Sequence, residues 1–203
     1  MDSFHITQKF GENQACISLD GKKTILCDGL NPPAGYKSQY GPGGHSGIDL
    51  RAYRWQPVYA AQDGIVTEVS TEESRGLGCR IVTTDRYWCE ETQTYEYFRY
   101  GNWHFIALDC YLGEKVRVGD LIGYADSTGN SSGDHLHFDL CPVRKVGNEW
   151  IKAIQNNTYG KIDPLPYIDP RFALAIAPLL QRLQEIIASL STVLADLLRR
   201  KQH

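Results

Sequence analysis

The sequence lacks several features that would define other classes of protein. Its six cysteines show no Cys-x-x-Cys spacing, which makes them poor candidates for a structural zinc site. No basic cluster occurs before Arg199-Arg200-Lys201, and the formal net charge is −3, so the charge pattern predicts no binding of nucleic acid. The start, Met1 to His5, has no basic segment followed by an apolar run, so we expect no secretory signal.

The residues that are present fit a globular domain with an appended helix. The chain has 203 residues, of which 42% are hydrophobic and 22% are charged. We place one domain at residues 1–168, because prolines accumulate at its end. In residues 169–203 apolar side chains recur at spacings of three and four, which predicts an amphipathic helix over residues 170–201. This helix is too charged to be a transmembrane segment. Its wide apolar face needs a partner, which could be the β domain or a membrane interface, but the polar face is not strongly basic, so we favour a homo-oligomer or docking to another protein.

Short apolar runs separated by turn signals predict that the first domain is all-β. The expected strands cover Ile48 to Ala52, Pro57 to Ala61, Gly64 to Ser70, residues 79–85, residues 95–108 and Val116 to Ala125. Asp63-Gly64 predicts a hairpin between the second and third of these strands. Residues 86–94 are expected to form a loop, and residues 141–168 to be less regular. The predicted fold class is therefore mainly β, with a C-terminal amphipathic α-helix.

A pair of histidines lies on the predicted strand that carries the main candidates for a functional site. In residues 134–140 the two-residue period of a strand places His135, His137 and Asp139 on one face. The apolar residues of the other face are Leu136, Phe138 and Leu140. Two imidazoles on one face can be directed at a metal or a substrate. Alone, the pattern fits equally well two partly exposed residues on the open face of a half-buried sheet.

A second polar site upstream favours the metal. If residues 44–50 are extended, His45, Gly47 and Asp49 share a face, and Gly47 leaves room between the two candidate ligands. His45, Asp49 and one histidine of the downstream pair would supply two nitrogens and one oxygen. Three protein ligands with an open fourth position are typical of a catalytic zinc site.

These motifs carry a family resemblance. His-x-x-x-Asp, followed by His-x-His at the end of the run from Ser127 to Phe138, resembles the lysostaphin/LytM-like zinc metallopeptidases, which cut peptidoglycan peptides. The resemblance covers roughly Ile6 to Leu140. It includes the stretches Ile6 to Gly11, Pro57 to Val66 and Gly113 to Gly123. It implies an antiparallel, barrel-like β core and an endopeptidase that acts on the bacterial cell wall.

The resemblance also implies roles for five side chains. His45, Asp49 and His137 would bind Zn²⁺, whereas His135 would not bind the metal and would act as a general base or an oxyanion donor. His104 matches a second catalytic histidine of the family, although Trp103 stands where the family has a small residue. Judged without the resemblance, His104 would be a packed or surface histidine.

Other interpretations were weighed against this one. Asp139 is either a carboxylate that orients an imidazole or one that faces solvent. A serine hydrolase using Ser127, Ser131 or Ser132 is discounted, because glycine-serine stretches are usually turns. A non-catalytic wall-binding or virion structural protein on the same fold would lack the metal ligands. A biotinyl or lipoyl carrier would need a lysine at a hairpin tip, which Val116 to Gly123 does not offer.

Two further expectations concern the environment of the protein. Without an export signal, a wall-cutting enzyme is made in the cytoplasm and reaches the wall after lysis or on a virus particle, which suggests a phage lysin or tail-associated enzyme. A mature form that lacks its signal is the competing explanation. Cys16 and Cys27 flank a predicted turn, and Cys79 and Cys89 flank a possible hairpin. An even number of cysteines does not by itself establish a disulfide.

Overall fold

The structure is a computed structural model that describes residues 5–12, 15–27, 32–38 and 44–168. The chain divides into two compact units, Met1–Pro164 and Leu165–His203, and the described part of the second is α1 (Leu165–Ile168). The helix predicted over residues 170–201 lies outside the described residues, so it and the boundary after residue 168 stay predictions. Within the part that is described, no helix is long and apolar enough to cross a membrane.

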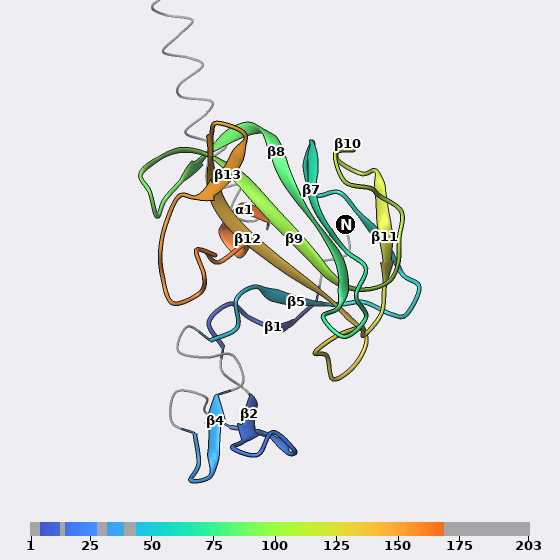
Figure 1. The fold of residues 1–203 in the computed structure, drawn as a ribbon, viewed down its shortest axis with the longest axis vertical. Helices are drawn as coiled ribbons and strands as arrows, with labels where there is room; N and C mark the ends of the chain where they lie inside the picture. Colours follow the sequence, from blue (N-terminus) through green and yellow to red (C-terminus); the bar gives the residue numbers. More distant parts are fainter. Residues whose placement is uncertain (1–4, 13–14, 28–31, 39–43, 169–203) are drawn as a thin grey trace, which may run out of the picture. The chain divides into compact units, whose positions relative to one another are not determined.

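A ten-stranded antiparallel sheet forms the first unit (Figure 1). Its strands are β1 (Ile6–Gln8), β5 (Ile48–Arg51), β6 (Pro57–Tyr59), β7 (Gly64–Ser70), β8 (Leu77–Cys89), β9 (Thr94–Leu108), β10 (Lys115–Val116), β11 (Leu121–Ala125), β12 (His135–Val146) and β13 (Glu149–Lys152). The main path is β1-β5-β12-β9-β8-β7-β10, while β11 pairs with β6 and β9, and β13 pairs with β12. The predicted mainly β, antiparallel fold is confirmed.

The long strands β8, β9 and β12 lie side by side and carry much of the core (Figure 1). Phe138 and Leu140 of β12 are buried, as the two-residue period predicts. The ring of Phe138 stacks on Tyr100 of β9 at a centroid distance of 6.0 Å. Burying side chains of this size stabilises the fold by about 1.5–3 kcal/mol each. The packed face therefore holds β12 in register, and its opposite face is left for polar residues.

A smaller sheet is formed by β2 (Ala15–Ser18), β3 (Thr24–Leu26) and β4 (Tyr36–Ser38), in the order β3-β2-β4. A disulfide between Cys16 and Cys27 links β2 to the residue that follows β3. Cys79 and Cys89, the other pair considered from the sequence, are both free thiols.

The hairpin predicted at Asp63-Gly64 is wrong. The two strands on either side, β6 and β7, do not pair with each other: β6 pairs with β11, and β7 pairs with β8 and β10. The Asp63 carboxylate instead accepts a hydrogen bond from the Val118 backbone N–H at 2.7 Å. The dipeptide thus forms a connection between two parts of the sheet, because long-range pairing outweighs the local turn preference.

The loop predicted over residues 86–94 is also wrong for most of its length. Strand β8 continues to Cys89 and β9 begins at Thr94, so the turn covers only residues 90–93. Residues 141–152, predicted to be less regular, mostly continue β12 and form β13. Glu96 and Arg144 explain part of this extension, because the buried Glu96 carboxylate pairs with the half-exposed Arg144 side chain between β9 and β12.

Candidate metal centre and active site

Strand register brings the candidate ligands together on one face of the sheet. On β12, His137 lies directly opposite Asp49 of β5 on one side and Trp103 of β9 on the other. Two residues further along β12, Asp139 lies opposite Gly101 of β9. Directly opposed residues on neighbouring strands point to the same face, so the polar side of β12 becomes one wall of a cleft.

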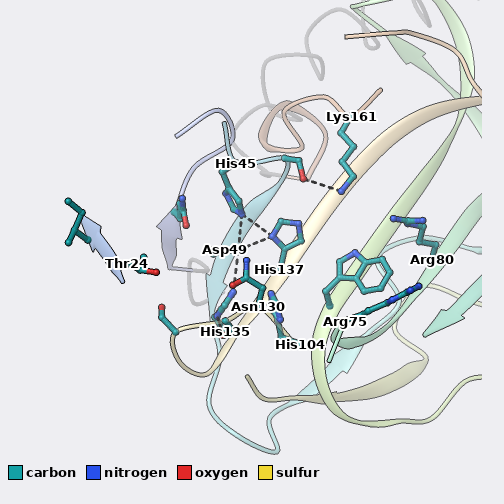
Figure 2. Close-up of a pocket in the computed structure, with 16 residues that line it drawn as sticks. Thr24, His45, Asp49, Arg75, Arg80, His104, Asn130, His135, His137 and Lys161 are labelled. Carbon is teal, nitrogen blue, oxygen red and sulfur yellow. Dashed lines mark hydrogen bonds and ion pairs between the residues drawn. The ribbon is translucent and has the colours of Figure 1, made fainter. Parts of the chain in front are cut away.

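Three side chains converge at the centre of this cleft (Figure 2). His45 Nε2 lies 2.9 Å from His137 Nδ1 and 3.2 Å from Asp49 Oδ1, and His137 Nδ1 lies 3.0 Å from the same oxygen. Gly47 makes the approach possible, because a Cβ at this position would lie 2.4 Å from the Phe138 carbonyl oxygen and 2.8 Å from the His137 ring. The room that the sequence suggested for Gly47 is therefore occupied by His137.

The contacts around the two imidazoles indicate which nitrogen of each ring would face a bound cation. His45 Nδ1 lies 3.1 Å from the Lys9 carbonyl oxygen, which requires a proton on Nδ1 and leaves a lone pair on Nε2. His137 Nδ1 lies 3.0 Å from Asp49 Oδ1, and its other nitrogen, Nε2, lies 4.0 Å from Asp139 Oδ2. A cation bound at Nδ1 would take the lone pair of that nitrogen and leave the ring proton on Nε2, on the side of Asp139. Two lone pairs and a carboxylate then meet at one point.

The size of this triangle fits zinc. Ligand atoms at roughly 2.0–2.1 Å around a tetrahedral ion are separated by about 3.3 Å, close to the three observed distances. Burial opposes ionisation of Asp49, but its interactions with His137 and His45 outweigh burial and hold the pKa of this carboxyl well below its ordinary value. Burial also lowers the pKa of His137, which keeps the ring neutral, as a metal ligand must be.

His104 reaches the same cleft through an irregularity in β9. Its backbone has φ = 70°, in the left-handed region, and the register between β8 and β9 shifts at this point. Trp103 and His104 are consecutive, yet both line the cleft, which an extended strand would not allow. His104 Nδ1 donates to the Thr128 carbonyl at 2.6 Å, so Nε2 is the unprotonated nitrogen. Burial lowers the pKa of His104 to about 4.

His135 completes the set of imidazoles. Its Nδ1 donates to the Gly133 carbonyl at 2.8 Å, and its Nε2 lies 3.5 Å from Asp49 Oδ1. The rings of His135 and His104 are 4.5 Å apart between centroids. All five residues predicted from the sequence line one cleft of about 720 Å³.

Asp139 was left out of the predicted site, and the structure places it beside the cluster. Only 1% of the residue is exposed, so the solvent-facing alternative is wrong. Its Oδ2 atom accepts hydrogen bonds from Trp103 Nε1 at 2.9 Å and Lys161 Nζ at 2.8 Å. The positive charge of Lys161 and the His137 ring outweigh burial, so the pKa of Asp139 is lowered. Nothing in the local sequence pattern identifies Lys161, because it approaches from beyond the strand that carries the histidines.

The serine-rich turn is not a nucleophile site. Residues 129–133 have Gly-x-Ser-x-Gly spacing, but the turn leads into strand β12 and not into the helix that a nucleophile elbow requires. Ser131 Oγ donates to the Gly133 carbonyl at 2.7 Å. The turn therefore serves to position His135.

An antiparallel sheet that presents two histidines, one aspartate and two further imidazoles in one cleft has the features of a metal-dependent hydrolase. The comparison with family models agrees, because the model described as Peptidase family M23 matches residues 43–149, which is more than half of the chain. The chain belongs to this family of peptidases.

Individual relatives show which parts are shared. The chain is 29% identical over 140 residues to the glycyl-glycine endopeptidase ALE-1 of Staphylococcus capitis, covering 64% of this chain and 32% of the relative. It is 32% identical over 95 residues to the DD-carboxypeptidase/endopeptidase Mpg of Neisseria meningitidis serogroup B, covering 47% of this chain and 19% of the relative. The chain thus spans a third or less of the length of these curated relatives.

A solved structure shows the same fold. The catalytic domain of the antimicrobial peptidase lysostaphin from Staphylococcus simulans matches with a TM-score of 0.52 and 18% identity, covering 81% of this chain and 92% of that domain. The antiparallel core implied by the resemblance is therefore confirmed at the level of the fold.

Proposed function

We propose that the protein is a zinc-dependent endopeptidase that hydrolyses peptide bonds in bacterial peptidoglycan. The observation that carries this proposal is the convergence of His45, Asp49 and His137, whose ligand atoms all lie within 4.8 Å of one another. Membership of Peptidase family M23 supports the peptidase chemistry. The names of the relatives, a glycyl-glycine endopeptidase and a DD-carboxypeptidase/endopeptidase, support short wall peptides as substrates.

In this proposal His45 Nε2, Asp49 Oδ1 and His137 Nδ1 hold the zinc ion. Bound zinc supplies Lewis-acid polarisation of a carbonyl group and of a water molecule. The chain supplies the geometry: the sheet fixes His137 against Asp49, and the Lys9 carbonyl fixes the ring of His45. Both histidines stay neutral ligands, so the centre keeps a net positive charge.

His135 is the proposed proton acceptor. Its Nε2 atom faces the cluster, 3.5 Å from Asp49 Oδ1, where it can take a proton from the attacking water and return it to the leaving amine. A histidine with a pKa of about 4 is a weak base at neutral pH, so His104 is less suited to this task. As a neutral imidazole His104 offers Nε2 as a second acceptor, which can orient the water or a substrate N–H.

Alanine substitutions separate metal binding from proton transfer. His45→Ala and Asp49→Ala should each lose bound zinc, measured by elemental analysis, together with the ability to digest purified sacculi. His135→Ala should keep zinc and lose about 10²- to 10⁴-fold in turnover, as expected for a proton-transfer group. His5→Ala, at an exposed position, is the matched control. Full activity in either ligand variant would show that the ligand assignment is wrong, and loss of zinc in His135→Ala would make His135 a ligand.

A further inference from the structure

Lys161 links the two chain segments that carry the candidate metal ligands. Its Nζ atom lies 2.8 Å from Asp139 Oδ2 on β12 and 3.1 Å from Ser46 Oγ, next to His45. Only 15% of the lysine side chain and 2% of the aspartate side chain are exposed. A lysine is rarely this buried unless it is paired, and here one ammonium group bridges the surroundings of His137 and His45. Figure 2 shows the Lys161 side chain pointing toward His45 and His137 from a segment outside the strands of the sheet.

Hydrogen bonds in the turn before Lys161 fix the position of this lysine. The Asn156 side-chain oxygen accepts hydrogen bonds from the backbone N–H groups of Thr158 and Gly160, at 3.1 and 2.8 Å. The Lys161 carbonyl accepts two further bonds, from Thr158 Oγ1 at 2.7 Å and from Asn156 Nδ2 at 2.8 Å. Ile162 then forms a bridge with Leu140 of β12. The side chain of Lys161 therefore leaves a rigid segment that is anchored to the histidine strand.

Asp139 lies between Lys161 and His137, so the position of the lysine also affects the histidine. Its Oδ2 atom is shared by Lys161 and the Trp103 indole N–H, and it lies 4.0 Å from His137 Nε2. This separation is too long for a hydrogen bond, so the carboxylate acts on the imidazole through its charge. When a cation is bound at Nδ1, the ring proton lies on Nε2, where the charge of Asp139 stabilises it. Space for this arrangement depends on Gly101, because a Cβ there would lie 2.8 Å from Asp139 Oδ2 and 2.7 Å from Trp103 Nε1.

We propose that Lys161 is a positioning residue of the metal centre, which acts through Asp139 on His137 and through Ser46 on the segment of His45. This inference rests on the proposed zinc site. Lys161 lies outside residues 43–149, the part of the chain that the family model matches. The ammonium group neutralises the buried carboxylate, fixes its position and thereby presets the distance between the two imidazole ligands. Removing it should weaken zinc binding without removing any ligand.

The test measures zinc affinity by competition with a chromophoric chelator. Lys161→Met should bind zinc about 10-fold more weakly than the wild type, the lower range for loss of a group that supports a ligand. Lys115→Met, the same change at an exposed position on β10, should leave the affinity unchanged. In the cobalt(II)-substituted protein, Lys161→Met should shift the visible absorption bands, which report ligand geometry, and Lys161→Arg should restore much of the wild-type spectrum.

Two controls keep the inference separable from folding and from the proposed function. Lys161→Met leaves Asp139 buried without its cation, so the double variant Lys161→Met/Asp139→Asn removes both charges and is expected to fold while still binding zinc more weakly. Wild-type affinity and an unchanged cobalt spectrum in both variants would overturn the positioning role and leave the zinc site standing. Failure of the wild-type protein to bind zinc would overturn both the site and this inference.

Discussion

At the residue scale, the site depends on close approaches that admit no extra atom. Gly47 shows this most directly, because it lies between the two proposed ligands, His45 and Asp49, and the His137 ring occupies the space next to it. An added methyl group would meet backbone as well as a ring, and β5 would have to move away from β12. Overpacking of this kind commonly costs about 1–3 kcal/mol.

Gly47→Ala is therefore expected to destabilise the protein by about 1–3 kcal/mol and to weaken metal binding, because β5 carries Asp49. Urea unfolding and a chelator competition would measure the two effects. Gly133→Ala is the matched control, since a Cβ there would meet nothing within 4 Å and the backbone is not in the left-handed region. Equal stability and affinity for both variants would contradict the close packing described for Gly47.

His104 is the residue whose placement the sequence could not establish. Its residue type and the family resemblance identify it as a candidate, but an unbroken strand would direct Trp103 and His104 to opposite faces. The positive φ of 70° and the register shift bring both into the cleft. Backbone strain at a functional side chain is a known feature of active sites, and it leaves no mark in the amino-acid pattern.

At the element scale, the extension of β8, β9 and β12 beyond the core is held by an ion pair. Arg144 Nε donates to both carboxylate oxygens of Glu96, at 2.9 and 3.0 Å. Hydrogen bonds from Arg144 lower the pKa of Glu96. A carboxylate whose pKa is lower in the folded state stabilises the protein above its unfolded-state pKa, and this contribution is lost as the pH falls through the folded value.

Glu96→Gln should reduce the free energy of unfolding at pH 7 by about 1–2 kcal/mol, a value kept low because the Arg144 side chain is half exposed. The difference between variant and wild type should shrink as the pH falls below the ordinary glutamate pKa of about 4.3, and it should be lost as the pH passes through the lower pKa of Glu96 in the folded protein. Denaturant titrations at pH 7 and at pH 3 would measure it. Glu149→Gln, an exposed position on β13, should show neither effect. A difference for Glu96→Gln that persists unchanged at pH 3 would show that the ion pair is not its source.

The same elements show where local signals mislead. Asp63-Gly64 has the composition of a hairpin turn, yet β6 pairs with β11 and β7 with β8. Tyr95 and Tyr97 lie in β9, which pairs with β12 on one side and β8 on the other. Because of this pairing, β8 and β9 extend into residues that were expected to form a loop. Pairing across the sheet decided both cases.

At the scale of the whole molecule, the residues proposed to act in catalysis all belong to the first unit. The proposed ligands, the two further histidines and Lys161 lie between residues 45 and 161, within Met1–Pro164. The helix predicted over residues 170–201 supplies none of them. Its predicted role is association with another copy or another protein, which the apolar spacing of its sequence suggests.

A chain ending at residue 168 should therefore keep zinc binding and wall-lytic activity within about twofold of the full chain, since no proposed site residue is removed. Light scattering after size exclusion should show a larger assembly for the full chain than for the shortened one, if residues 169–203 mediate self-association. A shortened chain that folds but loses its zinc would place an essential part of the site beyond residue 168. Equal molar masses would contradict self-association through this segment.

The sequence by itself determined the class of fold and the residues that are candidates for a metal site. Residue types and spacings sufficed for this, because a histidine pair on one strand face follows a geometry that any β-strand obeys. The expectation that residues 44–50 are extended holds only from Ile48 onward, since His45 lies before β5 and Asp49 lies in it. Short apolar runs likewise indicated strands, even where their ends were misplaced.

Only the tertiary structure decided which groups act together. Strand register placed Asp139 against Trp103 and made it a buried partner of His137, and a turn held by Asn156 brought Lys161 to the same carboxylate. Side chains separated by many residues meet through the pairing of distant strands, and the free energy of that pairing comes from the whole sheet. For this reason local pattern could name the candidate ligands, and only the folded sheet could show what holds them.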